Sequence, residues 1–181
     1  MVLSRKTLRK LILKEIFEKG ATAYQFVHKV DGRQSGSPHS HEYMFKTDDD
    51  LIYLVQIYAM SEYGEGQNAE KVWTGSWDVV FGTIDPQDPL EFSMNMTGKR
   101  DIKVLNTVIQ VVKDFVSNVR PTLPHPLYSF TNFKCEAEQE ETHGGTDDRR
   151  GRIYQYMLKK QGIASALSVD NSGRVIIEFE I

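Results

Sequence analysis

In the first half of the chain, apolar and polar residues mostly alternate, which is typical of half-buried β-strands. Residues 23–30 follow this pattern and end at a break rich in glycine, serine and proline. Further segments rich in aromatic and β-branched residues follow, separated by turn-forming residues. They are residues 41–46, 51–60, 73–84 and 90–96, with a polar loop at 61–70. The pattern predicts a mostly antiparallel sheet in this half of the chain.

In the second half, the apolar period changes to that of helices. Apolar residues between Ile102 and Phe115 recur at helical spacing, and a proline cluster begins at Pro121. Because proline interrupts a helix, the pattern predicts a long helix that ends before this cluster. The elements predicted after it are a strand at residues 127–137, a loop at 138–146, a helix at 147–161 ended by Gly162, and a hairpin of residues 164–169 and 174–181.

Residues 1–20 carry a third helical pattern. Apolar residues recur at helical spacing from Leu8 to Ile16, and Gly20 suits a C-terminal cap. Five basic residues precede the first acid, Glu15, namely Arg5, Lys6, Arg9, Lys10 and Lys14. Their side chains could contact anionic lipid, RNA or an acidic partner, or form the solvated face that any amphipathic helix requires. The predicted fold class is therefore α+β, with a mixed, mostly antiparallel sheet, an N-terminal helix and two later helices.

Length and composition fit one domain over residues 1–181, or one domain with residues 1–20 as an arm. With 40% hydrophobic residues and a net charge of −3, the chain has material for a core but lacks the positive field of a dedicated nucleic-acid-binding protein. Its longest apolar stretch, residues 51–60, is far shorter than the roughly 20 residues of a membrane helix. A single cysteine and a start without a signal-peptide pattern predict a cytoplasmic protein without a membrane span.

Motifs of common nucleotide-binding and hydrolytic enzymes are missing from the sequence. It has no Walker loop, no dinucleotide-binding fingerprint after a strand and no Gly-x-Ser-x-Gly turn. Cys135 lies inside a predicted strand, without a readable Cys-His-acid pattern. We expect it to be a buried structural thiol rather than a nucleophile.

A His-x-His pair, His39 and His41, stands at the start of a predicted strand. Both imidazoles would lie on one face of that strand, with Glu42 on the other. A metal ion would need a further ligand, such as His28 from the neighbouring strand or an acid of the following turn. Because a loop-like Ser-Pro pair comes just before His39, we expect exposed histidines and no metal site.

The predicted order over residues 73–181, namely strands, a helix, a strand, a helix and a final hairpin, resembles the GNAT acyltransferase fold. In that fold a strand parts from its neighbour beside a helix start that binds the pyrophosphate of coenzyme A. The resemblance implies acetyl-CoA as cofactor. It places cofactor binding at Thr97, Gly98, Lys99 and Arg100, and a tyrosine general acid at Tyr154 or Tyr156. The alternatives are a capped helix preceded by solvated basic residues, and tyrosines that pack in the core.

No general base stands out in this resemblance, since Glu91, Asp101 and Glu136 are equally plausible carboxylates.

A more local similarity is to small uncharacterised proteins of tailed bacteriophages. It rests on an aromatic strand, a Thr-Gly turn, a Val-rich helix, a Phe-bearing strand and a helix that starts with arginine and carries a tyrosine. The residues are Trp77–Phe81, Thr97-Gly98, Val104–Phe115, Ser129-Phe130 and Arg149–Tyr154. This similarity implies a viral source and assigns no chemistry.

Two classes of function follow from these observations. The sequence favours a non-catalytic phage-type protein that binds a host or virion protein, and the alternative is a coenzyme A-dependent N-acyltransferase. An acyltransferase should keep an open cleft beside Gly98. An interaction protein should instead expose an apolar or aromatic patch, for which Trp73, Trp77 and Tyr63 are candidates.

Overall fold

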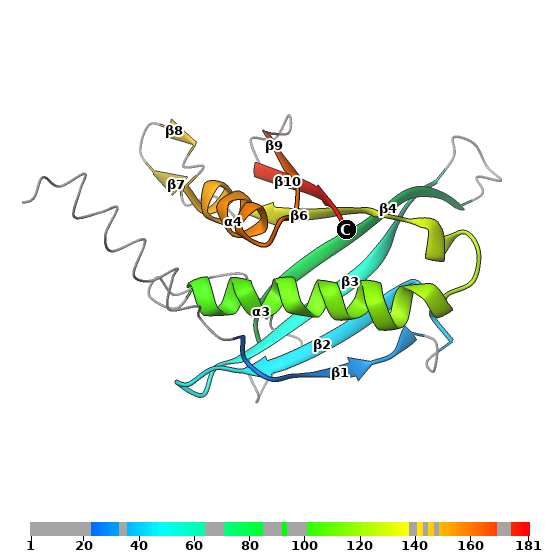
Figure 1. The fold of residues 1–181 in the computed structure, drawn as a ribbon, viewed down its shortest axis with the longest axis horizontal. Helices are drawn as coiled ribbons and strands as arrows, with labels where there is room; N and C mark the ends of the chain where they lie inside the picture. Colours follow the sequence, from blue (N-terminus) through cyan, green and yellow to red (C-terminus); the bar gives the residue numbers. More distant parts are fainter. Residues whose placement is uncertain are drawn as a thin grey trace, which may run out of the picture.

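The computed structural model of this chain describes residues 23–32, 36–63, 71–84, 92–93, 101–137, 141–142, 145–146, 149–169 and 175–181. In this part, one large sheet carries two long helices on one face (Figure 1). The helix predicted over residues 1–20 lies outside the described residues. Among the described helices, none has both the length and the apolar character needed to cross a membrane.

The main sheet is mixed and mostly antiparallel, as the sequence predicts. Its strands are β1 (Phe26–Val30), β2 (Ser40–Lys46), β3 (Ile52–Tyr63), β4 (Lys71–Ile84), β5 (Phe92–Ser93), β6 (Asn132–Ala137), β9 (Ser165–Val169) and β10 (Val175–Glu180). They are arranged in the order β1-β2-β3-β4-β6-β10-β9, and β5 pairs with β4. Strands β4 and β6 run parallel, whereas the other neighbouring strands of this sheet run antiparallel.

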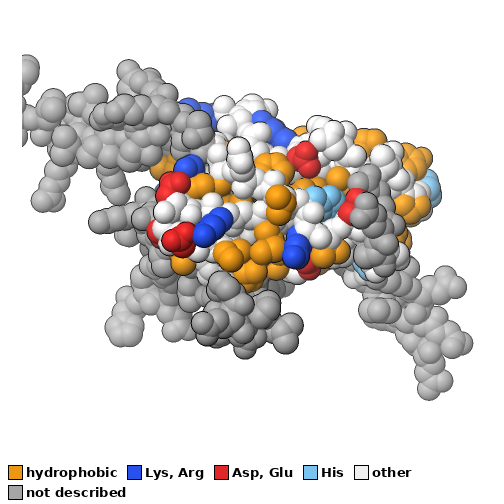
Figure 2. Space-filling model, turned by 90° about the horizontal axis from the view of Figure 1, so that it is seen from below, with side chains coloured by type: hydrophobic (Ala, Val, Ile, Leu, Met, Phe, Trp, Pro, Cys, Tyr) orange, Lys and Arg blue, Asp and Glu red, His pale blue; other side chains and the backbone are white. Residues whose placement is uncertain are grey.

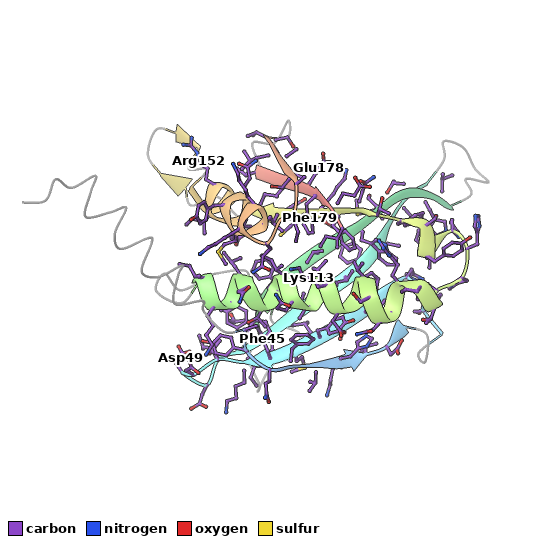
Figure 3. All side chains as sticks on the ribbon, viewed as in Figure 1. Phe45, Asp49, Lys113, Arg152, Glu178 and Phe179 are labelled. Carbon is purple, nitrogen blue, oxygen red and sulfur yellow. The ribbon has the colours of Figure 1, made fainter. Side chains whose placement is uncertain are left out.

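The sheet buries the face that the helices cover. Every second residue of β2, from His41 to Phe45, is buried, and the residues between them are partly exposed. Helices α3 (Asp101–Asp114) and α4 (Arg149–Lys160) pack against this face through apolar residues. Figure 3 shows Phe45 and Phe179 on opposite sides of α3, one from each half of the sheet. Helix α3 therefore packs across both halves.

Beyond its regular part, α3 continues as a π-helical turn, Phe115–Val119, and a 3₁₀ turn, Arg120–Thr122. The guanidinium of Arg120 donates hydrogen bonds to the backbone oxygens of Phe130 at 3.0 Å and Ile181 at 3.1 Å. Burial lowers the pKa of Arg120. This side chain thereby ties the segment after the helix to the end of β10.

The strand predicted over residues 127–137 is wrong in its first part. Leu127–Ser129 form a 3₁₀ turn and β6 begins only at Asn132. The backbone amide of Phe130 donates to the Leu127 oxygen, which closes the turn and interrupts the alternating pattern. The predicted loop at 138–146 contains a two-stranded pair, β7 (Glu141–Thr142) with β8 (Gly145–Thr146).

The centre of the core is aromatic. Trp77 of β4 is completely buried, and its ring makes edge contacts with Phe115 at 4.8 Å and Phe130 at 6.0 Å between ring centroids. The expectation that Trp77 helps to form an exposed patch is therefore wrong, and Trp73 is only half-exposed. On the face drawn in Figure 2, basic and acidic side chains are interspersed with hydrophobic ones, so the described part of that face has no continuous basic stripe.

Candidate functional site

Strands β4 and β6 part from each other within the sheet. Their parallel pairing covers Ser76 with Asn132, Trp77 with Phe133, and Asp78 with Lys134. Further along, β4 pairs with β5 from Thr83. Between these two pairings, residues 79–82 of β4 pair with β3 alone among the described residues. In the part of the chain that the structure describes, this stretch therefore has one backbone edge without a neighbouring strand, on which an extended chain can form hydrogen bonds.

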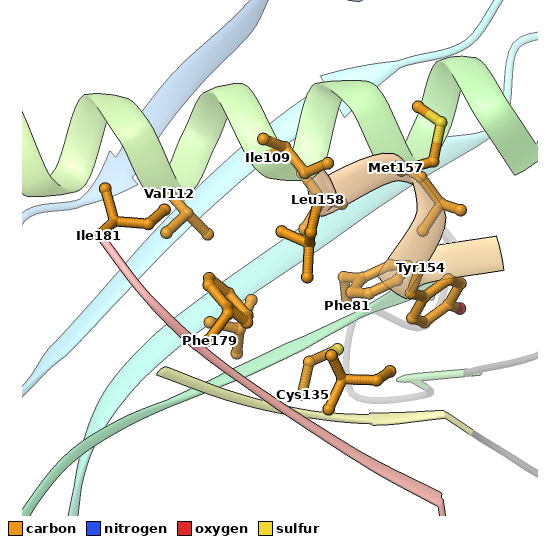
Figure 4. A pocket seen from close by; sticks show the side chains of 13 residues that line it. Phe81, Ile109, Val112, Cys135, Tyr154, Met157, Leu158, Phe179 and Ile181 are labelled. Carbon is orange, nitrogen blue, oxygen red and sulfur yellow. The ribbon is translucent and has the colours of Figure 1, made fainter. Parts of the chain in front are cut away.

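An apolar cavity lies on the helical side of this divergence. Its walls include Phe81 of β4, Cys135 of β6 and Ile177 of β10, with residues of α3 and α4 closing the other side (Figure 4). Its free volume is about 40 Å³. That volume corresponds to about three water-sized groups. The cavity thus suits a short apolar group and no charged one.

On the opposite side of β4, a buried carboxylate lies at the last parallel pair. Asp78 is 9% exposed, and the Tyr58 hydroxyl donates a hydrogen bond to its Oδ2 at 2.7 Å. Burial, and then the hydrogen bond and charge of Asp78, raise the pKa of Tyr58. The phenol therefore stays protonated at neutral pH and stabilises the charged form of the carboxylate.

The thiol of Cys135 is not poised for nucleophilic chemistry. It is buried in the cavity wall, and burial, followed by the charges of Asp78 and Glu136, raises its pKa to about 12. At neutral pH the group is an uncharged thiol, whereas a nucleophile requires thiolate. The structure agrees with the prediction of a structural cysteine.

Of the two candidate tyrosines, Tyr154 lines the cavity and Tyr156 does not. Tyr154 is 8% exposed and its ring lies 5.9 Å from that of Phe81. Its hydroxyl oxygen points away from Cys135 in Figure 4. Tyr156 is 48% exposed on the outer side of α4. The structure therefore brings only Tyr154 to the divergence.

The position of α4 depends on a glycine. A Cβ atom at Gly151 would lie 2.6 Å from Cγ1 of Val175 and 2.9 Å from Cδ1 of Leu167. Only a residue without a side chain lets the helix approach β9 and β10 this closely. This close approach places the following turn of α4, with Tyr154, on the cavity wall.

The remaining predicted site residues lie elsewhere. Thr97, Gly98, Lys99 and Arg100, the predicted anion-binding residues, lie outside the described part, as does Glu91. Glu136 follows Cys135 in β6 and is half-buried.

The predicted His-x-His pair is divided by the fold. The ring of His39 lies 5.7 Å from that of Trp73, whereas His41 is completely buried. Glu42 faces the other side and accepts a hydrogen bond from Gln56 at 3.0 Å. The expectation of exposed histidines is wrong for His41.

Sequence reasoning missed Asp78, although a signal for it was present. It is a single acidic residue inside the apolar run Trp77–Phe81, which forms a central strand. A carboxylate in such a position requires a hydrogen-bond partner, and here Tyr58 is directly opposite in the strand register. The partner could not be identified without that register.

Comparisons with protein-family models, with curated proteins and with solved structures found no match for this chain.

Proposed function

We propose that this protein is a coenzyme A-dependent N-acyltransferase. The observation that carries the proposal is the parallel pair β4 and β6, which parts after three residue pairs beside an apolar cavity. Helix α3 connects these two strands, and α4 and the β9–β10 hairpin follow. This is the order of elements that the resemblance to the GNAT fold implies, in which the diverging strands receive the cofactor.

The place where β4 and β6 part offers groups complementary to the thiol-bearing chain of coenzyme A. That chain is extended and carries amide groups, which can pair with the backbone edge of residues 79–82 as an added strand would. The acyl group on its sulfur then enters the apolar cavity, whose limited space favours a short acyl group such as acetyl. Lys99 and Arg100, just before α3, are proposed to bind the pyrophosphate.

The chemistry requires one base and one acid. The carboxylate of Asp78 lies on the side of β4 opposite the cavity, so the proposal assigns no general base. The acceptor amine loses its proton to solvent as its nitrogen attacks the thioester carbon. The carbon–sulfur bond then breaks, and the leaving thiolate takes a proton from Tyr154.

Calorimetric titration of the full chain with acetyl-CoA tests the proposal. We expect saturable binding of one molecule per chain, weakened by Lys99→Ala/Arg100→Ala. Tyr154→Phe should leave this binding intact and lower the rate of acyl transfer to amines by about 10²-fold or more. Absence of heat at millimolar acetyl-CoA, with the protein shown to be folded by circular dichroism, would overturn the proposal.

A second candidate function is a non-catalytic phage-type protein that binds a host or virion protein. It is favoured by Ile153 and Tyr156, which are 38% and 48% exposed and lie three residues apart on the outer face of α4. Exposed aromatic and aliphatic side chains of this kind are common in binding surfaces. For this function, Ile153→Ser/Tyr156→Ser should abolish capture of a specific host or virion protein and leave acetyl-CoA titrations unchanged.

A further inference from the structure

Three metal-ligating side chains converge where β1 ends beside β2. His28 of β1, Asp31 just after it and His41 of β2 each offer one ligand atom, and these atoms all lie within 4.8 Å of one another. Nδ1 of His41 is 3.3 Å from Nε2 of His28 and 3.8 Å from Oδ1 of Asp31. Two ligands of a tetrahedral ion, each at about 2.0–2.1 Å from it, lie roughly 3.3 Å apart. Small side-chain adjustments would therefore place all three atoms around one ion.

The backbone explains how these residues come together. The register between β1 and β2 shifts between His28 and Val30, at the end of β1. A Cβ atom at Gly32 would lie 2.4 Å from the backbone oxygens of both Ser37 and Ser40, so only glycine lets the chain fold back here. This close return holds Asp31 beside His41.

Packing and hydrogen bonding orient both imidazoles. The His28 ring is stacked on Tyr43 at 4.3 Å, with an angle of 4° between the planes. Nε2 of His41 lies 3.2 Å from the Pro38 carbonyl oxygen, which can only accept a hydrogen bond. Nε2 therefore carries the proton, which leaves Nδ1, the ring atom near His28 and Asp31, unprotonated and able to bind a metal ion. A backbone carbonyl that fixes the far nitrogen of a ligating histidine is a common feature of metal sites.

We propose that His28, Asp31 and His41 bind one divalent transition-metal ion, with Zn²⁺ as the best fit. Two imidazole nitrogens and one carboxylate oxygen suit Zn²⁺ and its neighbours rather than Mg²⁺ or Ca²⁺, which prefer oxygen ligands. His41 is completely buried, whereas the side chain of Asp31 is 12% exposed, which leaves the ion a route from solvent. The site lies on β1 and β2 and is independent of the proposed acyltransferase site.

The metal-free alternative is a purely structural role for His41. The backbone amide of Gly32 donates a hydrogen bond to Nδ1 of His41 at 3.3 Å, so the ring could serve only to tie the loop to β2. Under that alternative, neither His28 nor Asp31 would matter for metal binding. In the metal-bound state the ion takes the place of this long hydrogen bond.

Calorimetric titration of the untagged, metal-free full chain with Zn²⁺ separates the two roles. We expect one ion per chain with a dissociation constant on the order of micromolar or below, and at least about tenfold weaker binding in His28→Gln and in Asp31→Asn. His39→Gln is the matched control, because it removes a histidine from the same connection whose ring lies beside Trp73. It should bind Zn²⁺ as the original chain does.

Replacing Zn²⁺ by Co²⁺ gives an independent readout of the ligands. The visible absorption of Co²⁺ in a four- or five-coordinate site should appear with the original chain and with His39→Gln, and should disappear with Asp31→Asn. His41→Gln is kept as a secondary variant, since the loss of a buried, hydrogen-bonded ring can unfold the protein. A folded chain that binds no Zn²⁺ at equimolar concentration, or unchanged affinity in both His28→Gln and Asp31→Asn, would overturn the proposal.

Discussion

The two halves of the sheet fill their cores in different ways. In the half formed by β1 to β4, the antiparallel pairing is extensive and aromatic rings stack across it. Phe45 lies 5.1 Å from Tyr53 and 5.7 Å from Tyr24, with nearly parallel planes. Beside the half formed by β6, β10 and β9, aliphatic side chains surround a cavity together with Cys135, Phe81, Tyr154 and Phe179. The core is therefore filled where the strand pairing is continuous, and the cavity lies where β4 and β6 part.

Polar side chains gather in the first half of the sheet and at the boundary between the two halves. In the first half, His28, Asp31 and His41 gather where the chain folds back tightly after β1. At the boundary between the halves, Asp78 lies beside the strand divergence with Tyr58 as its donor. Each polar group thus marks a place where regular strand pairing ends, which is where a ligand can reach buried groups.

Removing the ring that joins the two halves should have the largest effect. Trp77 contacts Phe115 of the π-helical turn and Phe130 before β6. Trp77→Ala should lower the free energy of unfolding by about 3–5 kcal/mol, because the surrounding core cannot fill the space. Urea denaturation followed by circular dichroism measures this change. Trp73→Ala, at a half-exposed position of the same strand, should cost clearly less, and equal losses would refute this central role for Trp77.

Adding one methyl group to α4 tests the second half alone. Gly151→Ala places a Cβ atom 2.6 Å from Cγ1 of Val175, a side chain that is itself buried. Alanine favours a helix by about 1 kcal/mol over glycine, yet overpacking costs about 1–3 kcal/mol. We therefore expect a net destabilisation of about 1–2 kcal/mol in urea denaturation. Arg152→Ala, at the next and exposed position, should change stability little, and a stabilised Gly151→Ala would show that α4 has room to move.

Raising the pH should weaken the wall of the cavity. The pKa of Cys135 rises from its ordinary value of 9.0 to about 12 on folding. Below pH 9 the thiol is protonated in both states, so its contribution to stability is fully present. As the pH rises from about 9 toward 12, the unfolded chain loses its proton first and the folded state is destabilised. The free energy of unfolding, measured from pH 8 to 11, should fall more steeply for the original chain than for Cys135→Val. Parallel curves would show that the thiol is accessible to solvent.

Most of the fold could be predicted from sequence because its elements have clear periods. The alternation in β2 and the helical apolar stripe of α3 each determine one buried face, and both elements lie within about a residue of their predicted bounds. The error at Leu127 has a local cause, because alternating residues also fit a 3₁₀ turn followed by extended chain. The short turn hydrogen bonds that decide between these structures leave no periodic pattern.

The sites were harder to predict, because each depends on strand register. The hydrogen-bond partner of Asp78 is Tyr58, twenty residues earlier in the chain, and the two become neighbours only when β3 and β4 pair. His28, one of the further ligands that the sequence suggests for the His39–His41 pair, lies close to His41. Asp31 could not be predicted, because its position depends on the close chain return at Gly32 rather than on a pattern of residue types.

The smallest effect is expected at the surface of the second half. Nζ of Lys134 on β6 lies 3.2 Å from Oε1 of Glu178 on β10, and the two side chains are 40% and 49% exposed. Such pairs contribute about 0.2–1 kcal/mol, and the value falls as salt screens the charges. Glu178→Gln should therefore lower stability by at most about 0.5 kcal/mol at low salt and by less in 1 M salt. A larger, salt-independent loss would mean that pairing of β6 with β10 depends on this outer row of charges. The apolar contacts on the helix-covered face of β6 and β10 would then be insufficient to stabilise the second half. The cavity wall that these strands form would be less stable than the burial of its side chains indicates.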